Sequence, residues 1–188
     1  YPFQTEIIIT VSNDEDVNCV INSSPIQLFA CPPENDNCDG AIEAAVNADL
    51  TCNIVTSGTI TSASPSGNES ECISDMDDDV WFSFSATSNA QLISITDIVG
   101  STTNLGHALY VGSGNVLCST LEELYCVNNS SSIAEDLTVG TTYHLRIFSV
   151  GNDPQNVDFN LCISNLPENT TCDNATNFCG EGGALYGA

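Results

Sequence analysis

Apolar and polar residues alternate with a period of two along the second half of the chain. The clearest runs are Val80–Phe84, Gln91–Ile98, Tyr143–Phe148 and Val157–Ile163. Because successive side chains of a strand point to opposite faces, each run predicts a half-buried β-strand. Gly106–Val111 predicts a further strand that ends in a Gly-Ser-Gly-Asn turn. Short strands joined by such turns predict an all-β domain, an antiparallel sandwich or barrel.

The pattern is shorter and less regular before residue 80. Glu6–Val11 and Ile26–Ala30 are apolar runs that predict strands, but two strands are too few to form a core alone. The consecutive prolines at 32–33 close this part, because they interrupt both helices and sheet ladders. Leu50–Val55 and Gly58–Thr61 predict two short strands beyond them. We therefore expect the main module to begin after residue 31.

A sequence repeat supports this division. Residues 167–175 repeat residues 33–41, with Pro, Glu, Asn, Cys, Asp and Ala in the same order and spacing. Each copy follows an apolar run, which indicates a module that ends in a strand and a linker that opens the next module. We expect a strand segment or the end of a preceding module over 1–31, one complete module over 32–165, and a linker with the start of a following repeat over 166–188.

The charge of the chain is one-sided. Its 25 acidic residues, one arginine and no lysine give a net charge of −24. This argues against nucleic acid and anionic membranes as partners, since both require a cationic surface. It favours divalent cations and salty surroundings, which screen repulsion. Arg146 lies inside a predicted strand, so the acidic residues have almost no internal counter-charge.

The acidic residues are most concentrated just before the strand that starts at Val80. Asp75, Asp77, Asp78 and Asp79 precede it. Calcium binds six to eight oxygen atoms from carboxylates, carbonyls and water, so the run predicts either a bound cation or a solvated acidic loop. It is not an EF-hand, because Val80 occupies the position of the required glycine.

The linker offers a second set of oxygen ligands. Glu34, Asn35 and Asp36 lie in it, and alone they are typical of a turn or a helix N-cap. Together with the aspartate run they predict a calcium-bound joint that fastens the linker to the module's own strand. The predicted metal ligands are Glu34, Asn35, Asp36, Asp75, Asp77, Asp78 and Asp79.

Ten cysteines in an acidic chain without CxxC pairs indicate an oxidising compartment and disulfides rather than zinc. The pairs favoured by closeness in sequence are Cys118–Cys126, Cys19–Cys31 and Cys172–Cys179. The remaining cysteines are Cys38, Cys52, Cys72 and Cys162, which allow three pairings. The N-glycosylation sequons, which would accept glycans in a eukaryotic secretory pathway, begin at Asn22, Asn68, Asn128, Asn129, Asn169 and Asn174. No stretch is long enough to span a bilayer, and the start lacks the basic region of a signal peptide, so we expect a mature or excised piece of a secreted product.

No catalytic constellation is evident. His107 and His144 each lie in a strand pattern, which is typical of packed residues rather than of general bases. Nucleophile, metalloprotease and phosphate-loop motifs are lacking. The aromatic residues that could stack on a sugar are Trp81, Tyr110, Tyr125 and Tyr143. Their alternation with other apolar residues favours packing in the core or an interface.

Five segments together resemble a known family. In order they are ENDNC…A at 34–41, C…DDDVWFSF at 72–84, ALYVGSGNVLCSTLEELYC at 108–126, LTVGTTYHLRIF at 137–148 and VDFNLCI at 157–163. They are similar to the pre-peptidase C-terminal (PPC-like) β-sandwich, in the cysteine-bearing variety of secreted and surface proteins of Bacteroidetes. The resemblance covers residues 33–165. It implies a jelly-roll-like sandwich, often in tandem, appended to secreted enzymes or built into adhesins.

The resemblance also bears on calcium. Collagen-binding members of the family carry it between the linker before the first strand and an acidic loop. By position, the resemblance implies ligands among Glu34, Asn35 and Asp36 with Asp75 and Asp78, and with Asp77 or Asp79. Aspartates here replace the family's usual glycine-containing run before the strand.

We therefore predict an extracellular or cell-surface, non-enzymatic structural or adhesive module, part of a tandem array or surface filament, stapled by disulfides and calcium. The expected partners are copies of itself or neighbouring modules, joined by strand addition of Glu6–Val11, and an extracellular glycan or protein. Nucleic acid and membrane insertion are not expected. The alternative is a glycan- or protein-binding accessory domain of a secreted hydrolase, with an exposed aromatic platform around Trp81 or the tyrosines.

Overall fold

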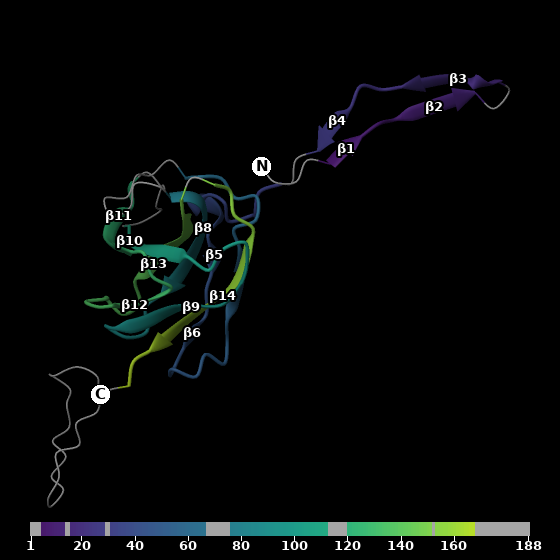
Figure 1. Cartoon of the computed structure of the whole chain (residues 1–188). Coiled ribbons are helices and arrows are strands. Elements are labelled where there is room, and N and C mark those ends of the chain that lie inside the picture. The colour runs from purple at the N-terminus through teal and green to yellow at the C-terminus, as the bar shows by residue number, and fades with distance from the viewer. Residues whose placement is uncertain are drawn as a thin grey trace, which may run out of the picture.

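A computed structural model of the chain describes residues 5–13, 16–28, 31–66, 76–112, 120–151 and 153–167. Within these ranges the chain forms β-strands and one short 3₁₀ helix, η1 (Cys38–Gly40). Two sheets pack face to face as a sandwich, and a two-stranded ribbon extends from it (Figure 1). The predicted all-β sandwich is confirmed.

The first sheet has the strand order β11-β10-β13-β8-β5. Its strands are β11 (Glu122–Val127), β10 (Leu105–Val111), β13 (Thr142–Val150), β8 (Met76–Ser85) and β5 (Ile42–Glu43). The neighbours are antiparallel except β5, which runs parallel to β8 with Ile42 opposite Phe82. β8 and β13 pair along most of their length, which places Trp81 opposite Arg146.

The second sheet has the order β12-β9-β14-β6, and β7 also pairs with β14. Its strands are β12 (Ser131–Ala134), β9 (Gln91–Gly100), β14 (Val157–Asn165), β6 (Val46–Asn47) and β7 (Thr56–Thr59). β6 runs parallel to β14. Both sheets are therefore mixed: the pairing is antiparallel as predicted, except that β5 and β6 each run parallel to a neighbour. The reason is that one extended segment, residues 42–47, pairs first with β8 and then with β14 in the same direction.

The core lies between the two sheets. Val80, Phe82 and Phe84 alternate along β8 and are fully buried on its inner face, as the sequence pattern predicts. The other large core residues are Ile93, Ile95, Leu105, Leu109, Leu145, Ile147, Phe159, Leu161 and Ile163. Fully burying an apolar side chain of this size contributes about 1.5–3 kcal/mol, so this interface is the main source of the fold's stability.

The first sheet is also covered on its outer face. Trp81, Ala108, Tyr110 and Phe148 form a second buried cluster there with Cys38. The covering layer is the linker, which we define as residues 32–37, and η1, which contacts β8. Side chains that alternate outward from β8 and β13 are therefore buried as well, and Asp79, one of the predicted metal ligands, is among them.

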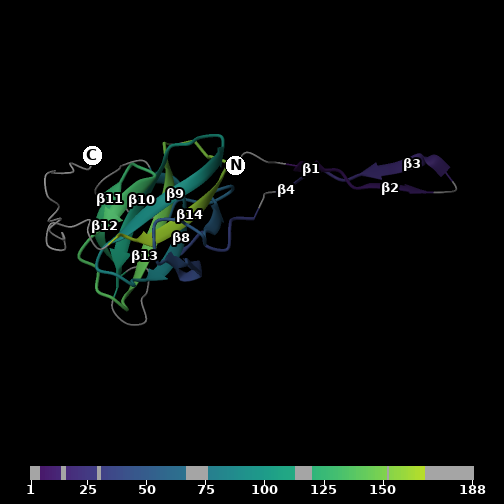
Figure 2. The same ribbon diagram turned by 90° about the horizontal axis from the view of Figure 1, so that it is seen from below.

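Residues 5–13 and 16–28 form the ribbon. Its strands are β1 (Thr5–Ile7) with β4 (Ile26–Leu28), and β2 (Thr10–Asn13) with β3 (Asp16–Asn22), each pair antiparallel. Between the two pairs, the Ser23 amide donates to the Ile9 carbonyl at 2.9 Å. Figure 1 and Figure 2 both show the ribbon pointing away from the sandwich. The strand predicted over Glu6–Val11 is thus split in two, and its partner is another part of the same ribbon.

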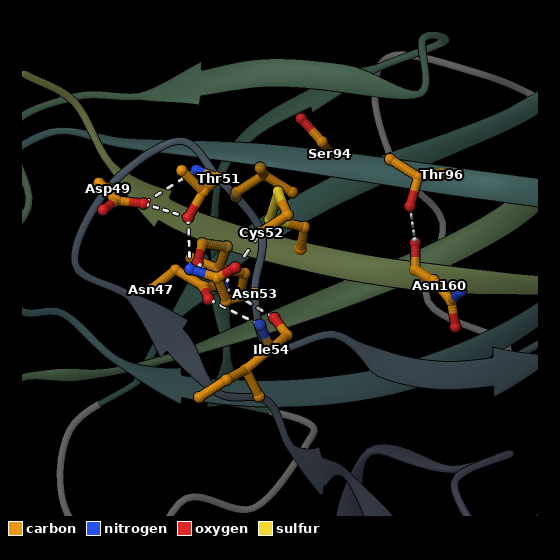
Figure 3. Close-up of a disulfide and its surroundings, with 12 residues drawn as sticks. Asn47, Asp49, Thr51, Cys52, Asn53, Ile54, Ser94, Thr96 and Asn160 are labelled. Carbon is orange, nitrogen blue, oxygen red and sulfur yellow. Dashed lines mark hydrogen bonds between the residues drawn. A yellow bond between two sulfur atoms is a disulfide. The ribbon is translucent and has the colours of Figure 1, made fainter.

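The strand predicted over Leu50–Val55 is wrong, because this stretch is a loop closed by a side chain. Asn47 Nδ2 donates to the Ile54 carbonyl at 2.8 Å, and Asn47 Oδ1 accepts from the Ile54 amide at 2.9 Å. Such local side-chain bonds to the backbone compete with ladder formation. The disulfide Cys52–Cys162 ties the loop to β14, with the two Cα atoms 5.7 Å apart (Figure 3).

Candidate functional site

A buried ion pair stands at the centre of the predicted metal site. Arg146 Nη2 donates to Asp79 Oδ2 at 2.6 Å, and both side chains are almost completely buried. Ser66 adds two bonds to the same carboxylate, one from its amide at 2.8 Å and one from its hydroxyl. The Arg146 guanidinium carbon also lies 5.8 Å from the centre of the Trp81 ring, a cation–π distance. The expectation that the acidic run lacks an internal counter-charge is therefore wrong for Asp79.

The linker is fastened to β8 through Asn35. The Trp81 amide donates to the Asn35 carbonyl at 2.8 Å, and Asn35 Nδ2 donates to the Trp81 carbonyl at 2.9 Å. Asn35 therefore binds β8 as a short strand would, with its side chain in place of a second backbone group. Trp81 Nε1 in turn donates to Ser66 Oγ at 2.8 Å, which links this contact to the ion pair.

Asp36 holds the segment around Ser64 against the linker. Its two carboxylate oxygens accept from the Ser64 amide and the Ser64 hydroxyl, each at 2.6 Å. Its carbonyl is 3.5 Å from Ser66 Oγ, from which it accepts a weak hydrogen bond. Ser64 and Ser66, which the sequence did not single out, thus supply the donors that the two buried carboxylates require.

The remaining predicted ligands lie elsewhere. Asp78 points to the opposite side of β8 from Asp79 and accepts from the Gln155 amide at 2.5 Å. Glu34 is exposed. Asp75 falls outside the described residues, and the side chain of Asp77 is not among those described.

The structure therefore brings Asn35, Asp36 and Asp79 together around Ser66 and keeps Asp78 apart. Across the described ranges, no group of three or more His, Cys, Asp or Glu residues could hold a metal ion. The carboxylates of Asp36 and Asp79 already accept hydrogen bonds from protein groups, so the described residues do not fit a calcium ion. The predicted calcium joint stays a prediction that depends on the acidic residues beyond them.

The structure assigns one disulfide that the sequence left open and corrects one predicted pair. Cys52–Cys162 belongs to one of the three pairings that Cys38, Cys52, Cys72 and Cys162 allowed. Cys38 and Cys126 are also disulfide-bonded. Cys31 is a free, exposed thiol, so the predicted Cys19–Cys31 pair is wrong. The partners predicted for the other pairs, Cys72, Cys118, Cys172 and Cys179, lie outside the described residues.

Both histidines are packed as the strand pattern indicates. His107 Nδ1 donates to the Asn129 carbonyl at 2.9 Å, which leaves Nε2 to accept from the Ser132 hydroxyl at 2.6 Å. The Tyr125 hydroxyl lies 2.9 Å from the same Ser132 oxygen. Burial lowers the pKa of His107 to about 4, so the ring is neutral at pH 7. Burial also lowers the pKa of His144. Neither ring is placed as a general base.

The four aromatic residues predicted as a sugar-stacking face form no exposed platform. Trp81, Tyr110 and Tyr143 are at most 5% exposed, and Tyr125 is half-buried. The Tyr110 hydroxyl donates to Glu123 Oε2 at 2.8 Å, and burial together with this carboxylate raises the pKa of Tyr110. The prediction that these residues pack in the core is confirmed for the buried three.

An open cleft of about 670 Å³ lies where the linker and β5 of the first sheet meet β7, β9 and β14 of the second sheet. Its apolar walls include Pro33, Ile42 and Val99, and Phe159 lies beneath them. A Cβ at Gly58 would lie 2.5 Å from the Phe159 ring. Glycine therefore lets β7 pack closely against this ring beside the cleft.

Three carboxylates, from Glu34, Asp97 and Asp158, line the cleft, and all three residues are exposed. Asp97 sits in a β-bulge, since two residues of β9 lie opposite one of β14, and its φ of +49° is left-handed. Asn160 Nδ2 donates to Asp97 Oδ2 at 2.9 Å, and the Ser57 hydroxyl donates to Asn160 Oδ1 at 2.9 Å. This chain of bonds fixes the aspartate that the bulge turns into the cleft. The outward polar positions of β14 were visible in the sequence, but the bulge was not.

Comparison with known proteins places the sandwich in a family. A sequence-family model described as galactose binding domain-like, associated with the type IX secretion system (T9SS), matches residues 34–161. The chain belongs to this family. A search of curated proteins gives no match. Among solved structures, the pre-peptidase C-terminal domain of a collagenase from Bacillus anthracis is 14% identical, covers 64% of this chain and 95% of its own, and has a TM-score of 0.33, too low to carry an argument.

Family membership indicates an extracellular, non-catalytic module of the binding or accessory type. The T9SS association indicates a secreted or surface protein. None of the helices in the described part of the chain has the length and apolar character to cross a membrane. The β-sandwich part of the predicted resemblance is thus confirmed.

Proposed function

We propose that the chain is a structural or adhesive module of an extracellular array or filament, and that the ribbon joins it to a neighbouring copy. The observation that supports this most is a group of exposed apolar side chains on the ribbon. Ile7, Ile8, Ile9 and Val11 are 41%, 54%, 53% and 63% exposed. The ribbon also lies outside residues 34–161, so the family domain does not account for it.

Physical chemistry explains why such a ribbon needs a partner. A two-stranded ribbon alone is marginally stable in water, and its outer edges leave backbone groups unpaired. Adding a strand or a second ribbon pairs these groups and buries the isoleucines. Copies of the chain repel each other at low salt, because each carries a net charge of −24. We therefore expect assembly at about 0.15 M salt and above, where the Debye length falls to about 8 Å.

The test compares two triple variants of the full chain. Ile7→Thr, Ile9→Thr and Val11→Thr keep the β-propensity of the ribbon and remove its apolar surface. The matched control, Ile54→Thr, Ile133→Thr and Val139→Thr, changes residues of similar exposure on the sandwich.

Sedimentation and electron microscopy at 0.15 M salt should show assembly of the wild type and of the control, and its loss in the ribbon variant. Equal assembly of all three proteins, or a monomeric wild type at high concentration, would refute the proposal.

The alternative, a glycan-binding accessory domain, loses its predicted support, since Trp81, Tyr110 and Tyr143 are buried. A protein-binding role keeps a specific observation in its favour, which is the acidic cleft. Calcium at the joint remains part of the proposed function. Of the seven ligands that the sequence predicts, Asp75 and Asp77 are those whose side chains lie outside the described part of the chain.

A further inference from the structure

We propose that the cleft between the linker and the second sheet is a docking site for a lysine- or arginine-bearing segment of a different protein. The cleft combines exposed apolar walls with carboxylates. Val99 is 68% exposed at its rim, and Pro33 and Ile42 form other parts of the wall. Lysine and arginine have the matching form, an aliphatic stem that covers apolar surface and a cationic end group.

The charges of the cleft support a cationic occupant. Glu34 and Asp158 make no side-chain hydrogen bond or ion pair with any described residue, and Asp97 is fixed by Asn160. A bound cationic end group would supply the counter-charge that this acidic chain does not provide there. A metal ion fits less well, because the described carboxylates of the cleft do not form a group of three that could hold one.

Two other occupants are disfavoured by the same residues. A sugar would need a stacking surface, but Phe159, the aromatic side chain that lines the cleft, is only 3% exposed. A second copy of the chain offers no lysine, and its single arginine, Arg146, is 2% exposed and paired with Asp79. The partner is therefore a different protein, and this site is independent of the ribbon contact between copies.

The test uses the full chain and a fluorescent twelve-residue glycine-serine peptide with two lysines, at 0.15 M salt. The cleft variant is Glu34→Gln, Asp97→Asn and Asp158→Asn. The control variant, Glu122→Gln, Glu135→Gln and Asp136→Asn, removes the same charge from other exposed positions. The two are matched closely, since Asp97 and Asp136 both have left-handed φ values, of 49° and 57°.

We expect the cleft variant to bind the peptide about tenfold more weakly than the wild type, and the control to change affinity less than about twofold. A peptide with acetylated lysines should not bind. Equal losses in both variants would show general charge attraction and overturn the proposal. The proposal would also be overturned if the wild type did not bind the peptide. A third contrary result would be a glycan that binds through the cleft carboxylates while peptide binding does not depend on them.

Discussion

At the scale of single residues, Arg146 decides whether the outer face of β8 can be buried. It is the chain's one basic side chain, and it neutralises Asp79 inside the protein. We expect Arg146→Met to lower the free energy of unfolding by about 3–5 kcal/mol, because it leaves a carboxylate buried without its cation. Urea denaturation at pH 7 measures this loss.

A double variant separates the ion pair from simple packing. Asp79→Asn removes the charge while keeping an oxygen to accept from Ser66. If the buried charge is the cause, Asp79→Asn with Arg146→Met should be more stable than Arg146→Met alone. Strictly additive losses would show that the pair does not act as a unit.

His107 gives a second residue-scale prediction, on pH. Its pKa is about 4 in the folded chain and near 6.5 when unfolded. The unfolded state therefore takes up a proton first as the pH falls. The free energy of unfolding is therefore not reduced by His107 above pH 6.5. It declines as the pH falls toward 4, by about 3 kcal/mol in total.

The variant His107→Gln tests that decline, since glutamine can donate to Asn129 and accept from Ser132 without titrating. Protonation of carboxylates also relieves charge repulsion over part of this pH range. The informative quantity is therefore the difference between the wild type and the variant in how the free energy of unfolding changes with pH. Between pH 7.5 and pH 5, the free energy of unfolding of the wild type should fall by about 2 kcal/mol more than that of the variant. Parallel pH profiles would contradict the assignment. His144→Gln, at a half-buried site, is the control.

At the scale of elements, the disulfide Cys52–Cys162 attaches the surface segment around Cys52, which is not part of a strand, to β14. The segment is also ordered by Asn47, and the two cysteines are 110 residues apart in the sequence. In the chain-entropy account, a loop of this length contributes about 4–5 kcal/mol. Cys52→Ser with Cys162→Ser should therefore lower the melting midpoint strongly. Cys31→Ser, which removes the exposed free thiol, should leave it unchanged.

The long strands were predictable from sequence because packing between two sheets imposes a strict alternation on them. β9, β13 and β14 follow the predicted runs closely, whereas β8 begins at Met76, four residues before the run predicted over Val80–Phe84, and takes in part of the aspartate run. β12 is four residues long and β6 only two, too short for a pattern to show. Leu50–Val55 is apolar but is ordered by a side chain rather than by a ladder.

The candidate site was predictable in position but not in chemistry. The repeat placed Asn35 and Asp36 near the acidic strand, and the structure does put both beside β8. The partner of Asp79 depends on the register of β8 against β13, which brings Arg146 diagonally within reach. The alternation of apolar and polar residues within each strand does not determine how β8 and β13 align with each other. The sequence therefore favoured an external cation over the internal arginine as the partner of Asp79.

At the scale of the whole molecule, the charge of −24 makes stability depend on salt. With one internal cation, the carboxylates of the folded chain repel one another more than those of the expanded chain. Raising sodium chloride from about 0.01 M to 0.15 M shortens the Debye length from about 30 Å to 8 Å and should raise the melting midpoint. A midpoint independent of salt would mean that repulsion between surface carboxylates is negligible.

The same melts separate screening from calcium binding. Calcium chloride and sodium chloride at equal ionic strength screen distant charges alike, whereas a structural site adds stability that grows with free calcium. The predicted calcium joint, whose seven predicted ligands include Asp75 and Asp77, requires a melting midpoint that is higher in calcium chloride than in sodium chloride. A chelator should reverse this difference. Asp77→Asn should abolish this difference, while Glu122→Asn, at an exposed position on β11, should not. Coincident midpoints in the two salts would contradict calcium at the joint and leave Arg146 as the cation that the acidic run needs.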